Sequence, residues 1–213
     1  MHKILLPIFL VVFLFSSCTK DRDLTIPTPV NTTDTLIYYW DFNGSPSFAT
    51  SIALNSGAFL SFDWGSGGYE DSLASTTSIN ARNGALMGNA LRVRTPITDF
   101  IVNIPTTSYK NIVVSYAVAK SSSGPALDSV FYTTDGINYK FVSLPSPSST
   151  GAYMVQTDPA YELISYDFSS IAAVNNNPRF AVKIVFYQSA GVPANTASGN
   201  DRFDNLTVDG VHQ

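Results

Sequence analysis

Short apolar segments separated by turn-forming residues restrict the fold of this chain more than any other feature. From Leu36 onward, clusters of Gly, Pro, Asn and Ser interrupt these segments, and several segments alternate apolar and polar side chains. A period of two is that of a β-strand, and no long stretch has the period of a helix. We expect strands at 36–42, 58–64, 90–95, 99–104, 111–119, 127–133, 138–144, 161–168, 180–188 and 202–209. About ten short strands predict an all-β fold, a two-sheet antiparallel jelly-roll sandwich.

The first 17 residues are typical of a secretory signal peptide. Lys3 precedes an apolar run over residues 4–15, and two serines follow that run. The run is shorter than the roughly 20 residues that a membrane-spanning helix needs. The segment Phe15-Ser16-Ser17-Cys18 resembles the lipobox of bacterial lipoproteins, in which the Cys is lipidated. An ordinary cleaved signal peptide is the alternative.

Lipidation of Cys18 would explain why an exported chain contains a single cysteine, which has no partner for a disulfide. The charged tract at residues 19–23 resembles the surface-export signal of lipoproteins from glycan-degrading Gram-negative bacteria. We therefore expect a signal peptide at 1–17, a lipidated Cys and a Pro- and Thr-rich tether at 18–35, and the sandwich at 36–213. The expected location is the bacterial outer membrane, facing the cell exterior. A periplasm-facing position is the alternative.

Charge and histidine content exclude several classes of function. The formal net charge is −4 at pH 7, which argues against nucleic acid as a partner because phosphate binding needs clustered Lys and Arg. The two histidines are His2, in the signal segment, and His212, next to the C-terminus. They leave no Ser–His–Asp triad, Cys–His dyad or ordinary zinc site. A glycoside hydrolase that uses the only two glutamates, Glu70 and Glu162, is the remaining enzyme hypothesis.

Three motifs carry a resemblance to a known group of domains. They are the segments 39–44 (Tyr-Trp-Asp-Phe-Asn-Gly), 131–139 (Phe-Tyr-Thr-Thr-Asp-Gly-Ile-Asn-Tyr) and 202–208 (Arg-Phe-Asp-Asn-Leu-Thr-Val). Their order resembles the first strand, central hairpin and last strand of jelly-roll carbohydrate-binding modules and MAM-type adhesion domains, of the concanavalin- or galactose-binding-like superfamily. The resemblance implies that the first and last strands lie side by side. Asp135-Gly136 between two strand-like runs independently indicates a hairpin.

The resemblance also implies a structural Ca²⁺ ion. Acids on the first and last strands often hold one in that superfamily, which points to Asp41 and Asp204, with Asn43 where the family usually has Glu. Asn200 and Asp201 are further candidates. Calcium accepts carboxylate, amide, carbonyl and water oxygens, so these residue types suit it. The alternative is that the acids are strand-end groups satisfied by backbone N–H donors.

Sugar-binding sites commonly set flat aromatic rings beside polar side chains. The segment 63–70 places a Trp and a Tyr at the two ends of a Gly- and Ser-rich loop, and further polar side chains follow in the next loop. The candidate ligand-binding residues are Trp64, Tyr69, Arg82 and Asn83. Trp64 also continues the alternating series of Leu60 and Phe62, and in that case it belongs to the core.

The sequence therefore favours a non-catalytic, surface-exposed lipoprotein that binds a glycan. A structural or adhesion component that contacts protein partners in a cell-surface assembly is the second hypothesis, and the carboxylate hydrolase is a distant third. Three Asp-Ser/Thr-apolar triplets resemble the O-glycosylation sequon of the same bacteria. Their acceptor residues are Thr35, Ser72 and Ser129.

Overall fold

The computed structural model describes residues 34–44, 48–63, 69–144, 151–189, 192–193 and 199–213. These residues belong to a compact unit that runs from Thr32 to Gln213. The predicted signal peptide, Cys18 and nearly all of the predicted tether lie outside them, so lipidation stays a prediction. Within the described ranges, no helix is long and apolar enough to cross a membrane.

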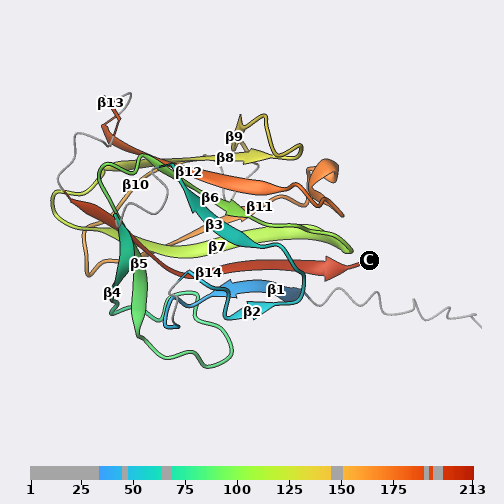
Figure 1. The fold of residues 1–213 in the computed structure, drawn as a ribbon, viewed down its shortest axis with the longest axis horizontal. Helices are drawn as coiled ribbons and strands as arrows, with labels where there is room; N and C mark the ends of the chain where they lie inside the picture. The colour runs from blue at the N-terminus through green and yellow to red at the C-terminus, as the bar shows by residue number, and fades with distance from the viewer. Residues whose placement is uncertain (1–33, 45–47, 64–68, 145–150, 190–191, 194–198) are drawn as a thin grey trace, which may run out of the picture. The chain divides into compact units, whose positions relative to one another are not determined.

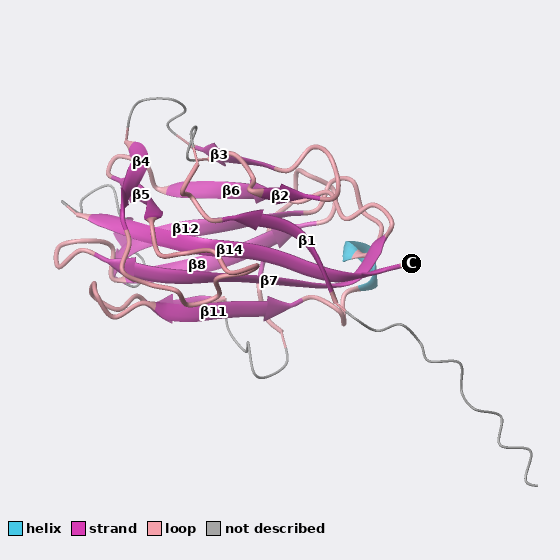
Figure 2. Cartoon of the chain, turned by 90° about the horizontal axis from the view of Figure 1, so that it is seen from below, coloured by secondary structure: helices cyan, strands magenta, loops and turns pink. Residues whose placement is uncertain are grey.

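The described residues form fourteen strands in two sheets (Figures 1 and 2). Sheet A has the order β11-β7-β14-β1-β2, with β5 on the first part of β14 and β4 beyond β5. Its strands are β1 (Thr35–Trp40), β2 (Ile52–Ala53), β4 (Glu70–Ala74), β5 (Asn89–Arg94), β7 (Tyr109–Lys120), β11 (Glu162–Asp167) and β14 (Asn200–His212). The paired strands in this sheet are antiparallel.

Sheet B has the order β10-β8-β12-β6-β3, with β9 on β8 and β13 on β12, again in antiparallel pairs. Its strands are β3 (Phe59–Phe62), β6 (Asp99–Asn103), β8 (Leu127–Thr133), β9 (Lys140–Phe141), β10 (Ala152–Met154), β12 (Ala181–Ser189) and β13 (Val192–Pro193). A single 3₁₀ turn, Ala172–Val174, is the helical element in the described residues, drawn in cyan in Figure 2. The predicted all-β, two-sheet antiparallel class is confirmed.

The first and last strands lie side by side, as the resemblance implied (Figure 1). Tyr39 pairs with Thr207 and Trp40 pairs with Leu206. On its other edge β14 pairs with β7 over most of its length. The ends of the domain are therefore built into the middle of sheet A.

The core lies between the sheets and follows the period-two pattern. Ile112, Val114, Tyr116 and Val118 on β7 are fully buried. Aromatic rings join the two layers, since the ring of Phe203 on β14 lies 4.9 Å from that of Phe100 on β6, at 69°. Complete burial of one such side chain contributes about 1.5–3 kcal/mol, so these rings are among the main contributors to the packing of the two sheets.

The outer face of sheet A is partly covered by the chain itself. In the loop between β4 and β5, Ile79 packs on a small cluster of Ala117, Ala119 and Tyr161. In the same loop, the Asn80 side-chain amide donates to the backbone oxygen of Asn205 at 2.7 Å. These contacts seal part of the outer surface over β14 and β7.

Candidate ligand-binding face

The outer face of sheet B presents a row of side chains from five adjacent strands. Residues paired across a sheet point to the same face, and the strands here alternate them with the buried core residues Phe100 and Ile184. The row consists of Ser61 on β3, Ile101 on β6, Lys183 on β12, Phe131 on β8 and Phe141 on β9. With strands about 4.8 Å apart, the row spans about 19 Å.

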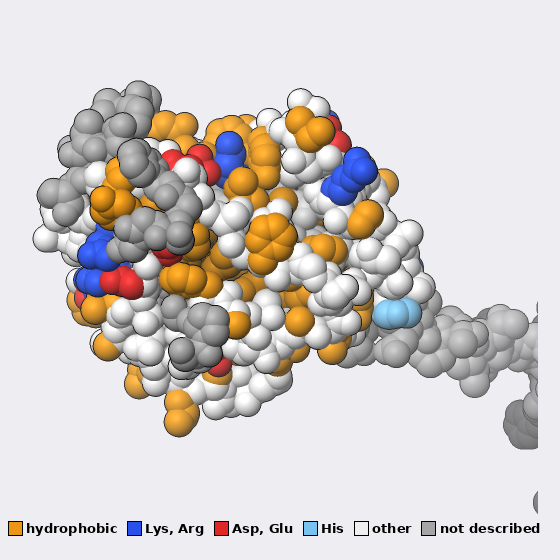
Figure 3. All heavy atoms as spheres, viewed as in Figure 1, with side chains coloured by type: hydrophobic (Ala, Val, Ile, Leu, Met, Phe, Trp, Pro, Cys, Tyr) orange, Lys and Arg blue, Asp and Glu red, His pale blue; other side chains and the backbone are white. Residues whose placement is uncertain are grey.

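Aromatic side chains are exposed along this face. Phe141 is 45% exposed, and Phe59, further along β3, is 54% exposed. The rings of Phe131 and Phe141 meet edge to face, with centroids 5.6 Å apart at 74°. On the side of the molecule seen in Figure 3, hydrophobic side chains likewise reach the surface beside basic and acidic ones. Such mixed surfaces suit ligands that have both apolar faces and hydroxyl groups.

Lys183 lies in the centre of the row, over two rings. Its Nζ is 4.7 Å from the ring centroid of Tyr139 and 5.9 Å from that of Phe131. Both distances are in the range of a cation–π contact. The rings hold the long side chain in place, and its ammonium group brings up to three hydrogen-bond donors to the face.

The tight turn of the β8–β9 hairpin positions Tyr139 and Phe141. Gly136 has a φ of 77°, which glycine adopts without strain. The Asp135 carboxylate accepts hydrogen bonds from the backbone N–H of Asn138 at 2.7 Å and from the Asn138 side-chain amide at 2.7 Å. These and the further bonds from Ile137 and Thr133 hold the pKa of Asp135 well below its ordinary value. The predicted Asp-Gly hairpin is confirmed, and it is internally hydrogen-bonded.

Acceptor groups lie at the β3 end of the face. The backbone N–H of Asp63 donates to the Asp99 carbonyl at 3.3 Å, and the Asp63 carboxylate accepts from Thr98 N–H at 3.1 Å. Burial raises the pKa of Asp99, the Lys183 charge lowers it, and the Asp63 charge raises it. Donor, acceptor and aromatic groups are thus interleaved on one sheet face.

The ligand-binding residues predicted from the sequence fall in different places. Trp64 lies outside the described residues, although its neighbour Asp63 is at the edge of the face. Tyr69 is exposed and accepts a hydrogen bond from Arg94, which pairs with Asn200 at the start of β14.

The predicted polar partners of Tyr69 lie elsewhere. Arg82 binds Asp209 near the other end of β14, at 3.3 Å, and Asn83 is exposed beside it in a turn with a φ of 52°. Nine residues along a strand are about 30 Å. The structure therefore does not bring Tyr69 together with Arg82 and Asn83.

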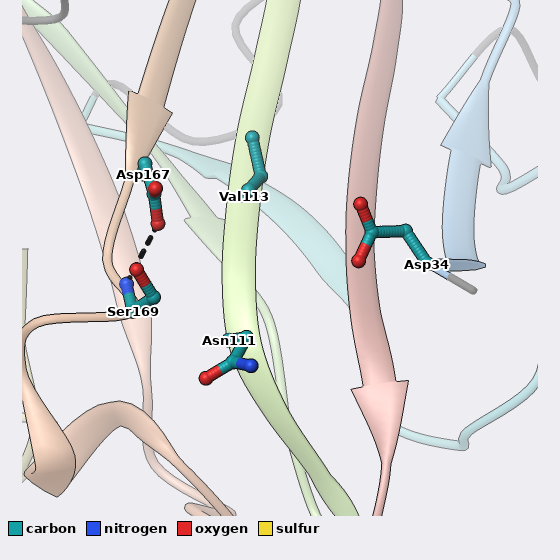
Figure 4. Close-up of a pocket in the computed structure, with 5 residues that line it drawn as sticks. All are labelled: Asp34, Asn111, Val113, Asp167 and Ser169. Atoms are coloured by element: carbon teal, nitrogen blue, oxygen red, sulfur yellow. Dashed lines mark hydrogen bonds between the residues drawn. The ribbon is translucent and has the colours of Figure 1, made fainter. Parts of the chain in front are cut away.

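Two adjacent shallow hollows occupy the outer face of sheet A. One, of about 470 Å³, is lined by Asp34, Asn111, Val113, Asp167 and Ser169 (Figure 4). In it, Ser169 N–H donates to the Asp167 carboxylate at 2.8 Å. The other, of about 420 Å³, contains Arg82. The described residues that line them include no aromatic ring, so they suit a sugar face less well than sheet B does.

The three residues expected to hold Ca²⁺ already have hydrogen-bond partners. Asp41 accepts from the Ser51 hydroxyl at 2.5 Å. The Asn43 carboxamide oxygen accepts from the backbone N–H of Asn89 at 2.5 Å, so it is turned toward the backbone.

Asp204 is buried, and burial raises its pKa to about 7. Hydrogen bonds from Ser75 and from the Asn205 backbone lower this pKa, and the charge of Asp41 raises it. These contacts match the alternative of hydrogen-bonded strand-end acids. In the described ranges, no three His, Cys, Asp or Glu side chains group to hold a metal. Calcium at Asp41, Asn43 and Asp204 stays a prediction.

Asp201 does not join that group, because alternation along β14 turns it the other way. It is fully buried on the same face of β14 as Phe203, whereas Asp204 faces outward beneath the β4–β5 loop, with Ser75. The neighbouring Asn200 is used locally, since its side-chain oxygen accepts from Arg202 Nε at 3.0 Å.

Glu70 and Glu162 are too far apart to act as a catalytic pair. They lie on β4 and β11, at opposite ends of the strand order β4-β5-β14-β7-β11. Four strand spacings are about 19 Å, whereas paired catalytic carboxyls in glycosidases are about 5–9.5 Å apart. The structure gives no support to a hydrolase built on these two residues.

The predicted O-glycosylation residues differ in accessibility. Ser72 is exposed on β4 and Thr35 is half-buried at the start of β1. Ser129 is 8% exposed within β8, which makes it the least accessible of the three. Modification at each of these residues stays a prediction.

No family model and no curated protein matches this chain. Among solved structures, it is similar to the xylan-binding domain CBM22-1 of Xyn10C from Paenibacillus barcinonensis. The identity is 12%, the match covers 85% of this chain and 98% of that one, and the TM-score is 0.50. The tandem CBM22-1–CBM22-2 domain of the same protein gives 13% identity, 86% and 48% coverage, and a TM-score of 0.50.

A putative sugar binding protein from Bacteroides thetaiotaomicron is more distant, with 12% identity, 75% and 90% coverage, and a TM-score of 0.42. The two CBM22 matches show that the described domain has the β-sandwich fold of carbohydrate-binding modules. The predicted jelly-roll fold is confirmed.

Proposed function

We propose that this protein is a non-catalytic glycan-binding module, anchored to the outer membrane through a lipid on Cys18 and facing the cell exterior. The observation that carries the binding function is the row of aromatic and polar side chains across the outer face of sheet B, in which Phe141 is exposed and Phe131 and Lys183 are partly exposed. The fold shared with a domain described as xylan-binding supports the same function. The anchor and the location rest on the sequence of residues 1–23.

Binding would use the two kinds of group that alternate on the face. The rings of Phe131, Phe141 and Phe59 offer apolar surfaces for sugar rings. Lys183 donates hydrogen bonds to hydroxyl groups, and Asp99 accepts them. Because the face carries the positive Lys183 at its centre and the acidic Asp99 and Asp63 toward its β3 end, a neutral glycan fits it better than a strongly charged one.

A glycan array with the mature chain, followed by titration calorimetry with the best ligand, tests this function. We expect Phe141→Ala to weaken binding tenfold or more, which is about 1.4 kcal/mol, because its ring is 45% exposed and supplies apolar contact area at the β9 end of the row. Leu163→Ala is the matched control, since Leu163 is 54% exposed on the opposite sheet. Equal affinity of both variants and the parent chain would place the ligand elsewhere.

A second function, contact with a protein partner in a surface assembly, is favoured by one observation. Leu86 and Met87 are 84% and 61% exposed side by side in the β4–β5 loop. Adjacent exposed apolar residues are a common feature of protein interfaces. If this loop binds a partner, crosslinking on intact cells should give a product that is lost with Leu86→Ser and unaffected by Phe141→Ala.

A further inference from the structure

Two carboxyl groups face each other between the sheets. Asp128 comes from β8 in sheet B and Asp201 from β14 in sheet A, and both are fully buried. They lie within hydrogen-bonding reach of one another. Tyr153 on β10 donates its hydroxyl to Asp128 Oδ2 at 2.9 Å. The other Asp128 oxygen and both Asp201 oxygens have no hydrogen-bond partner among the described residues.

Among the described residues, neither carboxyl group forms a salt bridge. Burying an unpaired carboxylate is costly, and burial raises the pKa of Asp128 to about 7 and that of Asp201 well above its ordinary value. The charge of Lys120 on β7 lowers the pKa of Asp201, but Lys120 is only partly buried and its effect is smaller than that of burial. The other ionisable groups around the pair are phenols: Tyr153, Tyr116 at 3.1 Å from the Tyr153 hydroxyl, and Tyr166 on β11.

We propose that Asp128 and Asp201 together hold one divalent cation of the calcium type between the two sheets. Calcium binds carboxylate oxygens at 2.3–2.6 Å, so two oxygens on one ion can approach each other to about 3 Å, which matches carboxyls within hydrogen-bonding reach. Three unpartnered oxygens supply the first ligands. Backbone carbonyls, tyrosine hydroxyls or water supply the others, because calcium takes 6–8 oxygens.

The chemistry of the oxygens distinguishes this site from the one expected at Asp41, Asn43 and Asp204. There, hydrogen-bond donors already contact the side-chain oxygens. Here three of the four carboxyl oxygens are buried without a hydrogen-bond donor among the described residues, and a bound cation would compensate their charge. The ion would tie β8 to β14. Asp128 lies three residues from Phe131, so the ion would hold the strand that carries part of the candidate ligand-binding face.

Luminescence of Tb³⁺, a calcium substitute that tyrosine sensitises, tests the site in the EDTA-treated mature chain. We expect tyrosine-sensitised emission that Ca²⁺ displaces, because Tyr153, Tyr116 and Tyr166 surround the pair. Asp201→Asn keeps the size of the side chain and should abolish the emission. Asp41→Asn should leave it intact. The opposite pattern, loss with Asp41→Asn alone, would move the ion to the outer site and overturn the proposal.

The Tm of the parent chain gives a second readout, which does not require any variant to fold. We expect Ca²⁺ at a hundredfold excess over its Kd to raise the Tm of the parent chain by about 5 °C or more. Asp201→Asn should remove that increase. No emission together with no effect of Ca²⁺ or EDTA on the Tm would mean that a shared proton neutralises the pair, and would overturn the cation site. The cation site and the glycan-binding function are tested separately, because glycan binding is measured by calorimetry and cation binding by Tb³⁺ emission and the Tm. Loss of one signal therefore does not imply loss of the other.

Discussion

Asn205 holds several parts of sheet A through one side chain. Its φ of 50° is left-handed, and the pairing of β14 with β7 shifts around it. Its carboxamide oxygen accepts from the Tyr39 hydroxyl at 2.6 Å, and its amide donates to the Ile79 carbonyl at 3.0 Å. Asn is among the few side chains that tolerate this backbone conformation. The Asp-Asn pair of the last-strand motif therefore has a structural role at its second position.

Replacing Asn205 separates its backbone role from its side-chain role. We expect Asn205→Ala to lower the free energy of unfolding by about 2–4 kcal/mol, because Ala is strained at positive φ and removes the acceptor of the buried Tyr39 hydroxyl. Asn205→Gly loses the same hydrogen bonds without the strain, so its loss should be about 1 kcal/mol smaller. Urea unfolding measures both values, and equal losses would contradict the backbone contribution.

At the scale of elements, the β8–β9 hairpin is the one that shapes the candidate face. We expect Asp135→Ala to free the turn and to weaken glycan binding several-fold, because Tyr139 and Phe141 follow directly. Asp167→Ala removes a comparable turn hydrogen bond, which the Ser169 backbone N–H donates on the other sheet, and serves as the control.

The pKa of Asp135 is lowered, so its contribution to stability is fully present above the ordinary pKa of 3.8 and is lost as the pH falls below that value. Carboxyl NMR titration checks that shift.

Elements with strong patterns were predictable and polar ones were not. The strand at 127–133 has the predicted bounds, and the pattern around 111–119 located β7. β4 was missed because its sequence, Glu-Asp-Ser-Leu-Ala, lacks an apolar period, and β2, β10 and β13 have two or three residues each. The predicted strand at 138–144 is reduced to Lys140–Phe141 because the hairpin turn occupies its start.

The candidate site was harder to predict than the fold for a physical reason. The sequence predicts a strand at 180–188, but only strand pairing brings its Lys183 beside Phe131 and Tyr139. Trp64 and Tyr69 are close in sequence, whereas the residues of the sheet B row come from five separate strands. Asp128 and Asp201 have no local signal of their proximity, since they meet only when the two sheets pack.

On the scale of the whole molecule, Phe203 connects the two layers. Its ring contacts Phe100 and Phe186 of sheet B, with centroids 4.9 and 6.0 Å away. We expect Phe203→Ala to lower the free energy of unfolding by about 3–5 kcal/mol. Because the Phe203 ring on sheet A packs against sheet B, the two sheets of the parent chain should unfold together. Fluorescence and circular dichroism should then give the same unfolding midpoint in urea. Separate midpoints would mean that the sheets unfold independently.

The pairing of β1 with β14 also has a mechanical consequence. β1 begins at Thr35, opposite Gly210, and is hydrogen-bonded to β14 on one side and to β2 on the other. A force applied at residue 34 along the strand axis therefore loads these bonds in shear, all at once, instead of opening them one after another. Under such tension the domain gives way only when the whole strand slides, so a pull at its first strand is resisted by the centre of sheet A.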